Sequence, residues 1–66
     1  MSYDDFQKRV NDVVQRSKAG VEVFFSEDDE GRMFANCSDG TTIIGNKKCL
    51  KVQIRWGSGH TALASI

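Results

Sequence analysis

A chain of 66 residues with 39% hydrophobic residues, no proline and a formal net charge of zero has room for one small domain. No apolar run approaches the roughly 18 residues of a membrane-spanning helix, and the acidic start of the chain is unlike a secretory signal. We therefore expect a single domain over residues 1–66 that is soluble, cytoplasmic and makes no membrane contact. A domain this small has little core, so a homo-oligomer is one expected route to stability.

The charges are distributed unevenly along the chain. The first 30 residues hold eight of the nine acids against four bases, whereas residues 31–66 hold five bases against Asp39 alone. This asymmetry predicts a surface with two ends of opposite charge, and it is the strongest functional hint that the sequence offers.

The opening segment, residues 2–19, is predicted to be a helix. Ser2 followed by Asp5 is a capping-box pattern, and Gly20 is a natural stop after the last turn. Oppositely charged residues four apart support the helix at Asp4–Lys8, Asp5–Arg9 and Asp12–Arg16. The apolar stripe recurs at helical spacing and consists of Tyr3, Phe6, Val10 and Val13, widened by Val14.

Five short strands are expected after the helix, and their order predicts an α+β domain with a five-stranded antiparallel meander. The longest alternation starts at Cys49 and places Leu50, Val52, Ile54 and Trp56 on one side, which indicates a strand with one buried face. Five short strands in so small a chain also fit a barrel of the SH3-like or Sm-like kind, as an analogy of topology without a shared motif. The predicted strands are residues 21–26, 32–37, 41–45, 49–56 and 60–66.

The last hairpin has two alternative registers. If Gly57, Ser58 and Gly59 form a three-residue loop, Trp56 faces His60 and the side chains of Ala62, Ala64 and Ile66 point to the core. If Ser58 and Gly59 form a two-residue turn, Leu63 points to the core instead. A slip of one residue reverses the buried side, so both registers remain open at this stage.

Chemistry-bearing residues are few and widely spaced. Cys37, Cys49 and His60 lack the short pair spacing of a zinc site, and no nucleophile elbow or phosphate-binding loop is present. We therefore expect no metal, no cofactor and no enzymatic activity. Whether Cys37 and Cys49 lie on neighbouring strands is left open, and in a reducing compartment both are thiols.

Two charged groups are the candidate binding sites. One is an acidic patch in a predicted loop, made of Glu27, Asp28, Asp29 and Glu30. The other is a basic set centred on the outer side of the 49–56 strand, made of Arg32, Phe34, Lys47, Lys48, Lys51, Gln53 and Arg55.

The predicted function is that of a small non-enzymatic binding module that acts through protein–protein contact, as a regulator or an inhibitor. Phe24 and Phe34 fall on the side of their strands opposite the predicted core, which suits a surface for association, whereas Trp56 is expected in the core. The alternative is binding of RNA or single-stranded DNA, because cations beside an exposed aromatic ring on a small sheet suit single strands.

Overall fold

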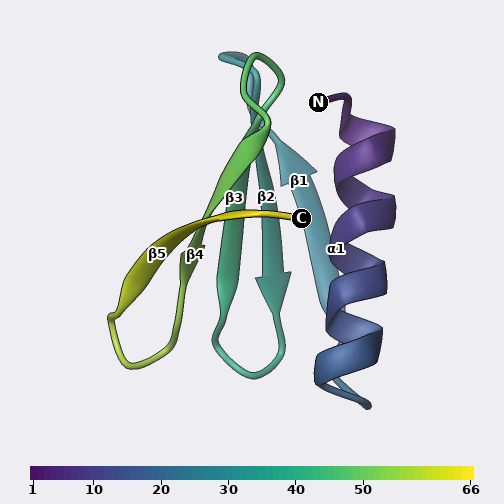
Figure 1. The fold of residues 1–66 in the computed structure, drawn as a ribbon, viewed down its shortest axis with the longest axis vertical. Coiled ribbons are helices and arrows are strands. Elements are labelled where there is room, and N and C mark those ends of the chain that lie inside the picture. Colours follow the sequence, from purple (N-terminus) through teal and green to yellow (C-terminus); the bar gives the residue numbers. More distant parts are fainter.

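The computed structural model of the protein describes residues 1–66 and contains one helix followed by five strands (Figure 1). The strands form one antiparallel sheet in the order β1-β2-β3-β4-β5, so each strand pairs with its neighbours in sequence. This is the predicted α+β meander. The elements are α1 (Tyr3–Ser17), β1 (Val23–Glu27), β2 (Arg32–Cys37), β3 (Thr42–Asn46), β4 (Lys51–Arg55) and β5 (Thr61–Ser65).

Helix α1 begins where its capping pattern predicts. The Ser2 hydroxyl accepts a hydrogen bond from the Asp5 amide at 3.1 Å, which satisfies one of the free donors of the first turn. The buried stripe is Phe6, Val10 and Val14, so the stripe drifts toward Val14, and Val13 is 36% exposed. Phe6, Val10 and Val14 are spaced four residues apart, which is slightly more than one helical turn. The line through them therefore rotates gradually around the helix, away from Val13.

Alternation along the strands separates a core side from an outer side. Met33, Ala35 and Cys37 of β2 are buried, as are Ile43 of β3 and Val52 of β4. The predicted 49–56 strand is shorter at both ends in the structure, because Cys49 and Leu50 belong to the β3–β4 turn and Trp56 follows the last residue of β4. Leu50, expected in the core, is 78% exposed for this reason.

The last hairpin adopts the three-residue loop. The Trp56 amide donates to the His60 carbonyl at 2.9 Å, and Arg55 pairs with Thr61. Ala62 and Ala64 therefore lie opposite Ile54 and Val52 on the core side of the sheet.

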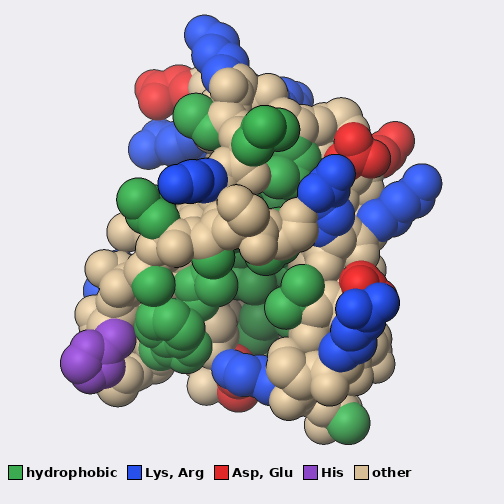
Figure 2. Space-filling model, in the orientation of Figure 1, with side chains coloured by type: hydrophobic (Ala, Val, Ile, Leu, Met, Phe, Trp, Pro, Cys, Tyr) green, Lys and Arg blue, Asp and Glu red, His purple; other side chains and the backbone are tan.

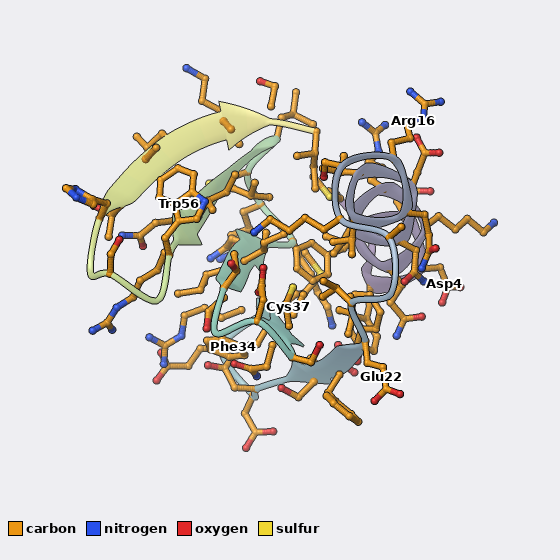
Figure 3. All side chains as sticks on the ribbon, turned by 90° about the horizontal axis from the view of Figure 1, so that it is seen from below. Asp4, Arg16, Glu22, Phe34, Cys37 and Trp56 are labelled. Carbon is orange, nitrogen blue, oxygen red and sulfur yellow. The ribbon has the colours of Figure 1, made fainter.

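The sheet is open, with β1 and β5 as its two edges, and closure into a barrel is not shown. It curves around α1, which lies on the concave side next to β1 and β2 (Figure 3). Phe6 of α1 meets Phe25 of β1 edge to face, with ring centroids 6.1 Å apart. The helix is too short and too polar to cross a membrane.

Polar contacts from three residues, Met1, Arg9 and Lys18, hold α1 on the sheet. The amino group of Met1 donates to the Lys47 carbonyl at 2.9 Å, and the Arg9 guanidinium donates to the Ile66 carbonyl at 2.6 Å. At the other end of the helix, the ammonium of Lys18 lies 2.6 Å from the Asp39 carboxylate and 3.1 Å from the hydroxyl of buried Thr41. Arg9 therefore contacts Ile66 and not Asp5, the partner that the sequence predicted.

We predict that Gly45→Ala destabilises the protein because the added methyl group would lie 2.8 Å from the Phe6 ring and 3.3 Å from the Met33 side chain. Overpacking of this kind costs about 1–3 kcal/mol. Urea unfolding measures the loss. The control is Gly57→Ala, whose new methyl group would meet no atom closer than 3.8 Å. Equal stability of the two variants would contradict this packing.

We also predict acid sensitivity from the contact between Lys18 and Asp39. The hydrogen bond from Lys18 lowers the pKa of Asp39 from 3.8 to about 2, helped by the Thr41 amide. The folded state therefore binds this proton more weakly than the unfolded chain. The resulting stability is fully present above pH 3.8 and is lost as the pH falls through about 2.

The measurement for Asp39 is the urea midpoint as a function of pH. Asp39→Asn should be less stable at neutral pH and should lose less stability in acid than the wild type. Asp29→Asn is the matched control, because Asp29 is exposed and forms no ion pair. Parallel pH profiles for the wild type and Asp39→Asn would refute the assignment.

Candidate functional site

The outer, convex side of the sheet is covered by no other element of the chain. Strand register places one row of side chains across it, in the order Ser26, Phe34, Ile44, Gln53 and Leu63. A second row beside the first runs through Phe24, Asn36, Thr42, Arg55 and Thr61. Figure 3 shows Phe34 on this side, whereas Cys37 of the same strand points toward α1.

Large apolar side chains lie on this outer face, and two of them are strongly exposed. Phe24 is 63% exposed and Leu63 is 74% exposed, while Phe34 and Ile44 are half-buried by their neighbours on the sheet. Phe24 and Phe34 are diagonal neighbours on adjacent strands, so their rings are within reach of each other. We define the outer face by the residues Phe24, Phe34, Ile44, Lys51, Gln53, Arg55 and Leu63.

The structure divides the predicted basic set in two. Arg32, Phe34, Lys51, Gln53 and Arg55 share the outer side of the sheet, whereas Lys47 and Lys48 lie in the β3–β4 turn. Arg32 and Lys47 are paired with acids, as described below. Lys48, Lys51 and Arg55 form no ion pair, so they carry the uncompensated positive charge of the set.

The predicted acidic patch is largely paired within the fold. Asp28 accepts hydrogen bonds from the amides of Glu30 and Arg32 and from the Arg32 side chain at 2.7 Å, and Glu30 lies 3.4 Å from the same guanidinium. Partial desolvation acts to raise the pKa of Asp28, but the hydrogen bonds from Arg32 and Glu30 outweigh it and lower the pKa. Of the four acids, Asp29 alone forms no ion pair or side-chain hydrogen bond, so the patch offers little free charge to a partner.

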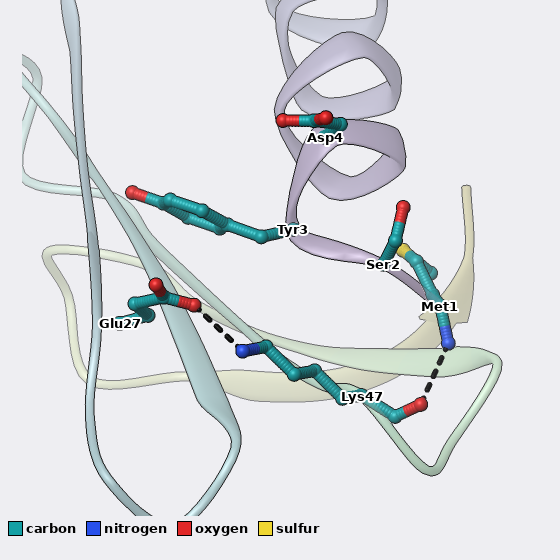
Figure 4. Close-up of a pocket in the computed structure, with 6 residues that line it drawn as sticks. All are labelled: Met1, Ser2, Tyr3, Asp4, Glu27 and Lys47. Carbon is teal, nitrogen blue, oxygen red and sulfur yellow. Dashed lines mark hydrogen bonds and ion pairs between the residues drawn. The ribbon is translucent and has the colours of Figure 1, made fainter.

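Lys47 is the centre of a second polar cluster, at the N-terminal end of α1 (Figure 4). Its ammonium lies 2.8 Å from Glu27, and this contact raises the pKa of Lys47. An open pocket of about 570 Å³ lies here, lined by Met1, Ser2, Tyr3, Asp4, Glu27 and Lys47. The contacts drawn in Figure 4 tie the chain terminus, β1 and the β3–β4 turn together, which is a structural role.

A separate apolar groove lies on the concave side, between the C-terminal half of α1 and β3–β4. Figure 2 shows hydrophobic side chains gathered in this hollow, between the β4–β5 hairpin and the helix. Its volume is about 190 Å³. Trp56 lines it and is 37% exposed, so the expectation of a core tryptophan is only partly met. The lining residues are Val13, Val14, Ser17, Lys18, Cys37, Thr41, Ile43, Ile54 and Trp56.

The cysteines and the histidine do not converge. Cys49 is exposed in the β3–β4 turn, and His60 lies in the β4–β5 loop at the opposite end of β4. Cys37 is buried at the end of β2 beside the β2–β3 turn, whereas Cys49 lies at the other end of β3, so the two are not neighbours. No three His, Cys, Asp or Glu side chains come close enough to share a metal ion.

Two outer-face residues, Ile44 and Leu63, were not predicted as site residues. Ile43 and Ile44 are adjacent, so one of them must face outward, and strand pairing decides which. The side of Leu63 depends on the length of the last loop, which the sequence left open. The alternation of β4 was the signal for Lys51, Gln53 and Arg55.

Comparison of the chain with protein-family models, with curated proteins and with solved structures finds no match.

We predict that the two thiols react at very different rates. Burial, together with the nearby Asp39 carboxylate, raises the pKa of Cys37, so its reactive thiolate is scarce as well as inaccessible. Cys49 is exposed and should react with a disulfide reagent at the rate of an unhindered thiol. Labelling of Cys49→Ser in native buffer and in urea measures the difference. Rapid labelling of Cys37 in native buffer would contradict the buried position.

Proposed function

We propose that this protein is a small non-enzymatic binding module that acts through protein–protein contact and uses its outer face. The observation that carries the proposal is the uncovered outer face, which holds the large apolar side chains of Phe24, Phe34, Ile44 and Leu63. Phe24 and Leu63 are each more than half exposed on a sheet surface that no part of the chain covers. Apolar patches of this kind on small proteins mark interaction sites, and buried aromatic anchors supply most of the energy of such interfaces.

The charges around these apolar side chains suggest which partner fits. Lys51 and Arg55 lie on the outer face and Lys48 precedes it in the β3–β4 turn, all without acidic partners. A complementary protein surface would therefore have an apolar centre and an acidic rim. Opposite charges at the rim of an interface steer association and suppress wrong partners. Binding of this kind suits a regulator or an inhibitor that blocks a surface of its target.

Nucleic acid is the second candidate, and one observation favours it. Phe24 and Phe34 are diagonal neighbours on the outer face, which is an arrangement on which bases of a single strand can stack. Against it, Arg32 and Lys47 are neutralised by acids, so few cations remain to contact phosphates. The predominance of apolar over uncompensated basic side chains is the reason for preferring a protein partner.

The test compares the wild type with two charge variants as affinity baits. The outer-face variant combines Lys51→Glu and Arg55→Glu. The control combines Lys8→Glu and Arg16→Glu, which makes the same charge change on the exposed side of α1. We expect the wild type and the control to capture an acidic protein in stoichiometric amount. The outer-face variant should bind this protein at least about tenfold more weakly.

An aromatic variant and a nucleic-acid titration complete the test. Phe24→Ser should weaken the captured protein's binding by about 2 kcal/mol or more if Phe24 is an anchor. Mixed single-stranded oligonucleotides are titrated at two salt concentrations, because phosphate contacts make binding salt-dependent. Salt-sensitive binding that Phe24→Ser abolishes would favour nucleic acid. A protein partner that all variants bind equally, or no stoichiometric partner at all, would overturn the proposal.

A further inference from the structure

The two edges of the sheet are protected to different degrees. In Figure 1, α1 lies beside β1, whereas β5 starts at the opposite side of the molecule and only its carboxyl end turns back toward the helix. β1 also carries Glu27. β5 (Thr61–Ser65) contains no charged residue and no proline, and all its residues except Ala64 are exposed. Natural proteins usually block free edges with charges, prolines, bulges or covering elements, and β5 has none of these along its length.

The free hydrogen-bonding groups of β5 follow from the ladder it forms with β4. The hydrogen bond from the Trp56 amide to the His60 carbonyl fixes the phase of that ladder. Bonded and non-bonded pairs alternate in an antiparallel ladder, so Ala62 and Ala64 exchange bonds with Ile54 and Val52. The N–H and C=O groups of the three remaining residues point away from β4; these residues are Thr61, Leu63 and Ser65.

We propose that this edge pairs with the β5 edge of a second copy of the chain, in antiparallel register about a two-fold axis at Leu63. In that register Leu63 lies opposite Leu63 of the second copy, and Thr61 lies opposite Ser65. Every outward-pointing N–H of one strand then meets an outward-pointing carbonyl of the other. The edge is self-complementary, which is what a closed two-fold dimer requires.

The side chains are compatible with this pairing. Leu63, 74% exposed in the single chain, packs against its copy on the outer side of the sheet, and Ala62 and Ala64 meet on the concave side. No charge of β5 is repeated across the axis, and each chain has a formal net charge of zero, so no overall repulsion separates the copies. The result is one continuous sheet that carries both outer faces on the same side. Leu63 alone belongs to both surfaces, and the dimer leaves Phe24, Phe34 and the β4 cations of the outer face free for a different partner.

Sedimentation velocity over a wide concentration range tests the dimer. We expect the wild type to shift from monomer to dimer as its concentration rises. Leu63→Lys and Leu63→Glu should each sediment as monomers where the wild type is dimeric, because like charges would face each other across the axis. An equal mixture of the two variants should restore the dimer. Leu50→Lys is the control, since Leu50 is exposed just before β4, on the side of β5 opposite the proposed contact, and its dimerisation should match that of the wild type.

Several results would overturn the proposal. They are a wild type that stays monomeric at every concentration, charge variants that dimerise as well as the wild type, or a mixture that stays monomeric. If circular dichroism shows that the charge variants do not fold, amide exchange of the wild type decides. Protection of the Leu63 and Ser65 amides must rise with protein concentration, and unchanged protection refutes the dimer. A negative result here leaves the outer-face test intact, because that test uses β1 and β4 residues.

Discussion

The contact between Phe6 and Gly45 determines how α1 sits on the sheet. A glycine on the core side of β3 leaves space for the phenylalanine ring, and any side chain there would meet it at 2.8 Å. The ring also packs on Phe25 of β1, so the helix is held over the β1–β3 half of the sheet. One helix of 15 residues cannot also cover β4 and β5. The apolar groove beside Trp56 and the free edge of β5 are consequences of this placement.

Local pairing removes much of the charge asymmetry that the sequence displays. Acids of the first half meet bases of the second half, since Arg32 contacts Asp28 and Lys47 contacts Glu27, and the contact of Lys18 with Asp39 joins the two halves with the charges reversed. These pairs close the loops around the sheet and attach the end of α1. The positive charge that remains is concentrated at the start and on the outer side of β4. The surface available to a partner is therefore smaller and more apolar than the sequence alone suggested.

The outer face and the β5 edge belong to one sheet, which links the two proposals. If two copies pair through β5, their outer faces become adjacent and point in the same direction. A partner with two equivalent sites would then be held at both, which raises its effective affinity without any new contact. Leu63 is the residue that lies in both surfaces, so variants at this position need both measurements.

Sequence alone determined the elements with strong periodicity or unambiguous stop signals. The cap at Ser2, a helix end close to Gly20 (predicted at residue 19 and found at Ser17), the meander order and the alternation of β4 all follow from local chemistry, because capping, turn formation and side-chain direction depend on neighbouring residues. Only the tertiary structure decided which of two adjacent isoleucines faces outward, that Leu50 belongs to a turn, and that Leu63 is exposed. It also decided that Lys47 is not free, since the pairing of β1, β2 and β3 brings Glu27 close to its ammonium group. Strand register and ion pairing depend on contacts between distant segments, and a pattern of neighbours along the chain carries no record of them.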